Sequence, residues 1–228
     1  CEAGMEDAIR VEAFVDSASE PPVRGFLHSP ANPNGSGLIL THGAGVNCGS
    51  ALLIAVSEGF ADDGFTVLRC DLPFRQARPF GPPHPIQAAR DREGLKRAVE
   101  IVRKKVSGRM FLGGHSYGGR QATMLCAEEP DLVDGLLILS YPLHPPRKPE
   151  QLRTQHVPNL CTKSLFIHGT RDPLGSIEEM EAALKLVPAK TDLLSREGAG
   201  HDLGFIKKEQ VPGLAKDVTR KFRDFFQI

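Results

Sequence analysis

Short apolar runs alternate with segments of helical periodicity along most of the chain, and this alternation restricts the available folds more than any other feature. Eight runs are rich in apolar and β-branched residues and end in glycine or turn residues: 9–15, 23–28, 37–40, 65–69, 109–113, 135–140, 164–168 and 192–196. The middle runs are apolar throughout rather than alternating, which is typical of strands that helices cover on both faces.

Segments with helical spacing lie between the later runs. Their apolar residues recur at three- and four-residue intervals, as in Leu95, Ala98, Val99, Val102 and Val106. Further stripes occur at 122–126, 177–187 and 214–226. Alternating strands and helices predict an α/β fold with a doubly wound, mostly parallel sheet and helices on both faces.

The first two runs have no helix between them, so we expect the turn at 19–22 to join them as an antiparallel hairpin at one edge of the sheet. No long linker or internal repeat divides the chain, and residues 1–228 are predicted to form a single domain. The irregular stretches 73–87 and 141–158 are expected to be loops at the functional edge of the sheet, because ligands of such folds bind at the carboxyl ends of the strands.

The charge balance excludes several classes of partner. The chain has 28 lysines and arginines and 28 aspartates and glutamates, so its net charge is zero. A neutral chain gives no electrostatic reason to bind nucleic acid or an anionic membrane surface. No apolar run approaches the roughly 20 residues of a membrane helix. The expected partner is therefore a small molecule.

The cysteines indicate neither a disulfide framework nor a zinc site, since the five are widely spaced and form no Cys-x-x-Cys pair. We expect no metal or cofactor and a reducing, cytoplasmic location. The chain begins with Cys1 rather than methionine. A cloning scar before Met5 or a simple truncation is favoured over a lipid-bearing first residue, and an upstream signal peptide stays an alternative.

A serine lies in a glycine-rich turn between a predicted strand and a predicted helix. Gly114, Ser116 and Gly118 fit the pattern G-x-S-x-G of a nucleophile elbow. The sharp turn forces the serine into a strained backbone conformation, and it needs glycine where a side chain would collide with the backbone. It also exposes the hydroxyl at a helix N-terminus, where free amides favour negative charge. Ser116 is therefore the candidate nucleophile.

A serine needs a histidine to accept its proton and an acid to orient that histidine. In chains that carry this type of nucleophile elbow, the three residues occur along the sequence in the order Ser, Asp or Glu, His. Asp172 comes just after the strand at 164–168, and His201 lies in a glycine loop after the last strand. His168, at the end of a strand, is the one serious rival as base. The favoured assignment is Asp172 as acid and His201 as base.

Two backbone amides are expected to form an oxyanion hole. One is the amide of Tyr117, directly after the serine. The other is assigned to Ala44, in the turn that follows the strand at 37–40. His42 is expected to support this turn by hydrogen bonding and to take no part in proton transfer.

Together these motifs resemble the α/β-hydrolase superfamily over essentially the whole chain, which implies an eight-stranded, mostly parallel sheet with an antiparallel second strand. More narrowly, segments 40–45, 114–119, 141–146 and 166–172 resemble a small lidless group. These are the bacterial relatives of testis-expressed protein 30 and of the third subunit of the histone-acetylating NSL complex, allied to dienelactone hydrolases. Residue by residue, the resemblance assigns nucleophile, acid and base to Ser116, Asp172 and His201. Dienelactone hydrolases use cysteine where this chain has Ser116, which argues against lactones as substrates.

The loop at 73–85 carries Arg75 and Arg78, which are candidates for binding an anionic group of the substrate. The alternative is that they are solvated or pair with Asp71 or Asp91. Only about two dozen residues separate the runs at 135–140 and 164–168, too few for a helical lid domain.

The sequence therefore favours a serine hydrolase that cleaves a small or medium ester or thioester through an acyl-enzyme. The alternative is a non-catalytic scaffold or interaction protein that keeps the fold, since fold alone does not establish function.

Overall fold

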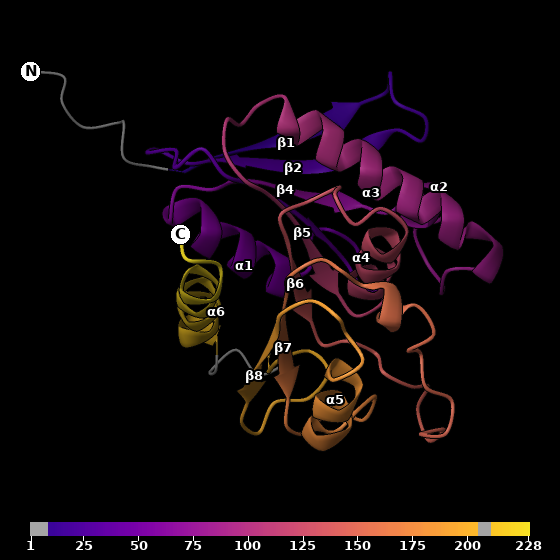
Figure 1. Cartoon of the computed structure of the whole chain (residues 1–228). Coiled ribbons are helices and arrows are strands. Elements are labelled where there is room, and N and C mark those ends of the chain that lie inside the picture. Colours follow the sequence, from indigo (N-terminus) through magenta and orange to yellow (C-terminus); the bar gives the residue numbers. More distant parts are fainter. Residues whose placement is uncertain (1–8, 205–210) are drawn as a thin grey trace, which may run out of the picture.

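The computed structural model describes residues 9–204 and 211–228. The features of Cys1 and Met5 discussed above lie outside these residues. The described strands form one eight-stranded sheet in the order β1-β2-β4-β3-β5-β6-β7-β8 (Figure 1). Their bounds are β1 Arg10–Asp16, β2 Val23–Ser29, β3 Gly37–Thr41, β4 Thr66–Asp71, β5 Met110–His115, β6 Gly135–Leu139, β7 Ser164–Gly169 and β8 Thr191–Arg196.

The sheet is parallel apart from its first edge. Strand β2 pairs antiparallel with both β1 and β4, and every other pair is parallel. The predicted antiparallel hairpin and the predicted antiparallel second strand are therefore confirmed. The eight predicted strands all form, with ends that differ by one or two residues from the expected ones.

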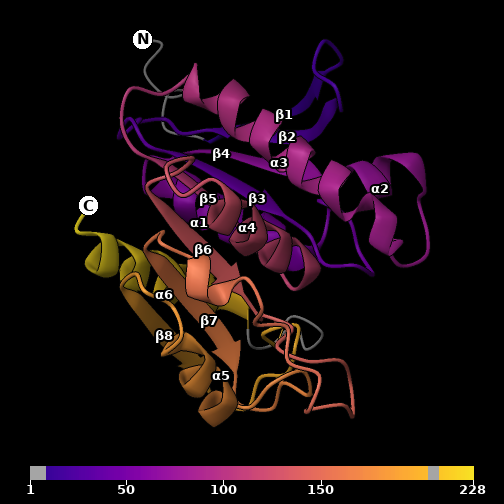
Figure 2. The same cartoon turned by 45° about the vertical axis from the view of Figure 1, so that its right-hand side comes forward.

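Helices cover both faces of the sheet (Figures 1 and 2), as the sequence predicted. Helices α1 and α6 lie on one face, while α3, α4 and α5 lie on the other. The helices are α1 Ala51–Asp62, α2 Pro73–Ala77, α3 Ala88–Arg103, α4 Tyr117–Glu128, α5 Ile177–Leu184 and α6 Val211–Phe226, with short 3-10 turns η1 Pro85–Gln87 and η2 Val157–Asn159.

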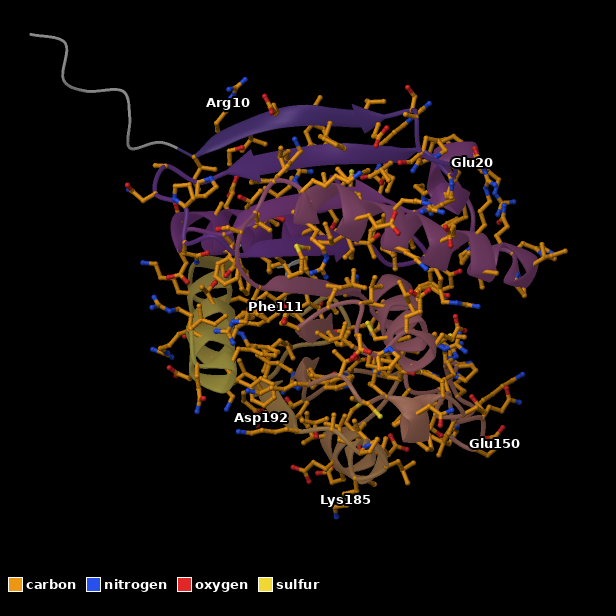
Figure 3. All side chains as sticks on the ribbon, turned by 45° about the horizontal axis from the view of Figure 1, so that its top comes forward. Arg10, Glu20, Phe111, Glu150, Lys185 and Asp192 are labelled. Atoms are coloured by element: carbon orange, nitrogen blue, oxygen red, sulfur yellow. The ribbon has the colours of Figure 1, made fainter. Side chains whose placement is uncertain are left out.

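The central strands are apolar throughout because their two faces enter two separate cores. In β3, Leu38 and Leu40 belong to the core under α1 and α6, whereas Ile39 belongs to the core under α3 and α4. Figure 3 shows Phe111 inside the molecule, where its ring lies 4.9 Å from that of Phe222 on α6. Burying apolar side chains on both faces makes the sheet a rigid platform for the loops at its edge.

Two helices were not expected from the sequence. Helix α1 is the first helix after β3, and its apolar stripe was not singled out. The five-residue α2 lies inside the stretch 73–87 that was expected to be a loop. Pro73 stands at its first position, where proline is tolerated because the missing N–H would have no intrahelical partner.

The connection from β6 to β7 carries only the 3-10 turn η2, so no helical lid covers this edge within the described residues. Of the helices in 9–204 and 211–228, none is long and apolar enough to cross a membrane.

Candidate active site

Ser116 occupies a strained turn between β5 and α4. Its φ of 53° and ψ of −117° lie in a region that residues with side chains rarely adopt. The flanking glycines are required by space, since a Cβ on Gly118 would lie 2.6 Å from the carbonyl oxygen of His42. A Cβ on Gly114 would lie 2.9 Å from the backbone of Gly118. The chain therefore has the geometry of a nucleophile elbow at the predicted serine.

The structure brings Ser116, His201 and Asp172 together from three different loops. Nε2 of His201 lies 2.7 Å from Oγ of Ser116, and Nδ1 of His201 lies 2.7 Å from Oδ2 of Asp172. With the proton on Nδ1, the imidazole donates to the carboxylate and accepts the hydrogen bond of the serine hydroxyl. The three side chains are thus hydrogen-bonded in series, in the arrangement that a Ser-His-Asp triad requires.

Asp172 is held by its own loop. Its Oδ1 accepts a hydrogen bond of 2.9 Å from the backbone N–H of Leu174, and its side chain is fully buried. The rival histidine, His168, approaches the same carboxylate oxygen as His201 but lies farther away, with Nε2 3.6 Å from Oδ2. Nε2 of His168 lies 2.8 Å from the carbonyl oxygen of Gly175, and burial lowers the pKa of this histidine. His168 is therefore a neutral residue that ties the acid loop to β7.

His115, the residue before the serine, contacts the histidine loop. Its Nε2 lies 2.8 Å from the backbone carbonyl oxygen of His201 and donates to it. Burial, the largest cause, lowers the pKa of His115 to about 4, so the ring is neutral near pH 7. No pattern in the sequence had pointed to this contact.

The loop after β3 lies beside the serine. His42 Nδ1 donates to the carbonyl oxygen of Gly43 at 2.8 Å, and its Nε2 accepts from the N–H of Leu72 at 3.1 Å. Burial lowers the pKa of His42, which keeps the ring neutral. This confirms the predicted hydrogen-bonding support of the loop. Ala44 and Tyr117 line one pocket with Ser116, and the N–H of Tyr117 lies in the first turn of α4, where amides have no intrahelical acceptor.

Arg75 does not lie as the sequence suggested. Its guanidinium is buried, and its five N–H groups donate to backbone carbonyl oxygens of five residues, which are Ala44, Val46, Arg78, Pro79 and Gly81. All its donors are therefore occupied, which leaves none for a substrate anion, and Arg75 forms no ion pair with Asp71 or Asp91. Arg75 instead clamps the loop after β3 to the proline-rich loop.

Arg78 is exposed, and its guanidinium donates to the carbonyl oxygen of Pro82. It does not line the pocket at Ser116. Asp91, an alternative partner for these arginines, is buried and instead accepts hydrogen bonds from the Tyr117 hydroxyl at 2.8 Å and from the N–H of Phe74 at 2.9 Å. Burial raises the pKa of Asp91.

A pocket of about 530 Å³ opens at Ser116. Apolar residues form much of its wall, and two arginines, Arg120 and Arg153, line it as well. Neither arginine was expected at the site from the sequence. Arg120 follows the elbow by one helical turn, and that spacing was the available signal; Arg153 lies in the long irregular connection, where spacing carries no such information.

The described cysteines form no disulfide. Cys48, Cys70, Cys126 and Cys161 are all free, and the first three are buried. Burial raises the pKa of both Cys48 and Cys126 to about 12, so these thiols stay protonated. Within 9–204 and 211–228 no group of acidic, histidine and cysteine side chains could hold a metal ion.

Comparison with known proteins agrees with this architecture. Residues 34–224 match the family model described as an alpha/beta hydrolase domain. A dienelactone hydrolase from Anabaena variabilis has a similar structure, with a TM-score of 0.72, 20% identity, and coverage of 96% of this chain and 97% of that one. Est1E from Butyrivibrio proteoclasticus has a TM-score of 0.70 at 17% identity, covering 95% of this chain and 99% of the other.

A third similar structure is a serine hydrolase without a lid from Xanthomonas campestris, with a TM-score of 0.67, 15% identity, and coverage of 93% and 95% of the two chains. At such identities these likenesses show the fold. The fold and the elbow define a hydrolase of the α/β class. By the match of its sequence to the family model, the chain belongs to the alpha/beta hydrolase family.

Proposed function

We propose that the protein is a serine hydrolase that cleaves a small or medium ester or thioester through an acyl-enzyme. One observation carries the proposal: Nε2 of His201 lies 2.7 Å from the Ser116 hydroxyl while Nδ1 lies 2.7 Å from the Asp172 carboxylate. A scaffold has no physical need for this alignment, which favours catalysis over the non-catalytic alternative.

In the acylation step, Oγ of Ser116 attacks the carbonyl carbon while its proton passes to Nε2 of His201. The tetrahedral intermediate then collapses, the bond from carbon to the leaving oxygen or sulfur breaks, and the leaving group takes the proton from His201. Water repeats the sequence on the acyl-enzyme and releases the acid. Asp172 holds the imidazole in the required tautomer and stabilises the imidazolium.

The negative oxygen of the intermediate is assigned to the amides of Ala44 and Tyr117. Removing one such donor from a comparable site costs about 100- to 1000-fold in rate. The Arg75 clamp would fix the first amide, because the guanidinium binds the carbonyl oxygen of Ala44 itself. The second is fixed by the start of α4.

The neighbouring structures support this class of reaction without defining the substrate. One is a dienelactone hydrolase, and Est1E also has a structure with bound ferulic acid. The narrower resemblance to the relatives of testis-expressed protein 30 adds no substrate. The pocket of about 530 Å³, open at Ser116, suits a small or medium acyl group.

Labelling with a fluorophosphonate probe tests the proposal. We expect the wild type to be labelled on Ser116 and Ser116→Ala to be unlabelled and folded, as judged by circular dichroism. Asp172→Asn should label more slowly and lower kcat on esters by about 10⁴-fold, because the imidazole would lose its required tautomer. Absence of labelling in the folded wild type, or labelling that persists in Ser116→Ala, would refute the proposal.

A further inference from the structure

Two arginines in the pocket are not used by the proposed mechanism. Arg120 lies in the first turn of α4, and its backbone N–H donates to the carbonyl oxygen of Ser116 at 2.9 Å. Arg153 lies in the connection between β6 and β7. Both line the pocket that opens at Ser116. Two segments that are distant in sequence therefore bring positive charge to the nucleophile.

Neither charge is neutralised within the part of the chain that the structure describes. Arg120 and Arg153 form no ion pair there, and the lining of this pocket contains no aspartate or glutamate. NH1 of Arg153 donates only to the carbonyl oxygen of Pro142, at 3.3 Å. Nε of Arg120 is buried and has no hydrogen-bond partner. A buried donor that lacks an acceptor is costly, and the wall of this pocket offers the two arginines no carboxylate.

The two charges act on each other. Burial and then the positive charge of Arg120 lower the pKa of Arg153. The charge of Arg120 also contributes, after burial, to the low pKa of His156, about 4. Like charges in a partly buried wall repel, and an anion that enters the pocket would relieve this repulsion.

The position of Arg120 adds a second cost. A cation in the first turn of a helix opposes the helix dipole, which favours negative charge there. Beside it Gln121 is fully buried, and its Nε2 has no partner although its Oε1 accepts from Arg92 at 3.2 Å. Costs of this kind that nothing in the fold offsets are found mainly at functional sites.

From this arrangement we propose that Arg120 and Arg153 bind an anionic group, a carboxylate or a phosphate, of the ester or thioester that Ser116 attacks. The inference rests on the proposed hydrolase function. Guanidinium groups bind both anions through paired N–H donors. Met124 and Leu174 line the same pocket and offer apolar contacts to the rest of the substrate.

Matched esters test the subsite. On the acyl side, monomethyl adipate is compared with methyl hexanoate and with the phosphonate analogue of the adipate. On the alcohol side, the acetate ester of ω-hydroxyvalerate is compared with pentyl acetate. Each is assayed with the wild type, Arg120→Gln, Arg153→Gln, Arg120→Lys and a control, Arg24→Gln. Arg24 is exposed on β2, so the substitution Arg24→Gln removes one positive charge outside the pocket.

We expect the wild type to prefer an anionic ester over its neutral match by about tenfold or more in kcat/KM, as one charge-assisted contact provides. Arg120→Gln and Arg153→Gln should each remove most of that preference and leave the neutral ester within about twofold, whereas Arg120→Lys keeps part of it. Arg24→Gln should behave as the wild type. Preference for the carboxylate or for the phosphonate identifies the natural anion. No preference in either series, or equal losses on charged and neutral esters, would overturn the proposal.

A binding measurement separates this inference from the hydrolase proposal. Ser116→Ala is titrated calorimetrically with the same esters, with and without Arg120→Gln. Tighter binding of an anionic ester that Arg120→Gln abolishes supports the subsite even if labelling refutes serine catalysis. Equal binding of charged and neutral esters by Ser116→Ala would refute the subsite even if the serine is labelled.

Discussion

Nε2 of His115 donates a 2.8 Å hydrogen bond to the backbone carbonyl oxygen of His201, so the residue that precedes Ser116 holds the loop that carries the proposed base. The two imidazole rings also lie close together, with centroids 5.2 Å apart. Because His115 ends β5 and its neighbour Ser116 begins the elbow, this bond joins two loops that belong to different strands, in addition to the contact between His201 and Ser116.

The first prediction concerns His115 as a positioning residue. His115→Phe keeps a buried ring but removes the donor, so His201 loses its anchor. We expect kcat to fall about 10- to 100-fold, as small displacements of catalytic groups do, with KM nearly unchanged. His115→Gln, which retains an N–H donor, should recover part of the rate. A folded His115→Phe protein with wild-type kcat would contradict this role.

The second prediction concerns the space at the elbow. In Gly118→Ala the new Cβ would lie 2.6 Å from both the His42 oxygen and Cγ2 of Thr41, so the turn must open. We expect loss of esterase activity and a free energy of unfolding lower by about 1–3 kcal/mol, the usual cost of overpacking. Gly213→Ala in α6 is the control, since its Cβ meets nothing nearer than 3.8 Å. Urea unfolding and kcat/KM measure both; equal behaviour of the two variants would refute the steric argument.

The third prediction distinguishes Arg75 from the pocket arginines. Arg75→Met leaves five backbone carbonyl oxygens without their donor and frees the loop at Ala44. We expect the free energy of unfolding to fall by about 2 kcal/mol or more. Activity on neutral and anionic esters should fall by the same factor, in contrast to Arg120→Gln. A loss confined to anionic esters would restore the substrate contact that the sequence suggested.

The fourth prediction follows from a histidine that stays neutral when folded. Burial, followed by the charges of Arg120 and Arg92, lowers the pKa of His156 from 6.5 to about 4. Above pH 6.5 both the folded and the unfolded chain hold this ring neutral, and stability does not depend on it. Between pH 6.5 and 4 the unfolded chain binds the proton and the folded chain does not. The free energy of unfolding therefore decreases by about 1.4 kcal/mol for each unit by which the pH is lowered.

Urea unfolding of the wild type and of His156→Gln at pH 7, 6 and 5 measures this effect, because these values span the upper part of the range between the two pKa values of His156. The amide side chain does not titrate, so the variant should lose stability less steeply toward acid. Parallel curves for the two proteins would show that His156 titrates normally in the folded state.

Much of the fold was predictable because it depends on local patterns. The apolar runs predicted the strands. The absence of a helical segment between residues 15 and 23 predicted the antiparallel hairpin of β1 and β2. Helix α2 was not predictable from spacing, because a five-residue helix has too few turns to show a stripe. The triad residues were each predicted from a strand end followed by a turn, and the structure brings these three side chains within hydrogen-bond distance.

The roles of the arginines were not predictable, because they depend on where long side chains reach across the fold. Arg75 lies on the loop that borders the site, as expected, but its guanidinium turns toward backbone carbonyl groups of the chain itself. Arg153 reaches the pocket from a segment whose sequence shows no regular spacing. Such tertiary contacts leave no periodic signal along the sequence.

The three triad side chains follow strands β5, β7 and β8, and Ser116 precedes His201 by 85 positions. During synthesis a ribosome releases the serine, and later the aspartate, well before the imidazole that would activate the hydroxyl. A nascent polypeptide that ends after β7 thus carries an inert alcohol. Under the proposed mechanism, the Ser116 hydroxyl becomes reactive only after β8, the final edge strand, has joined the sheet. The nascent chain therefore cannot be acylated until all eight strands have been synthesised.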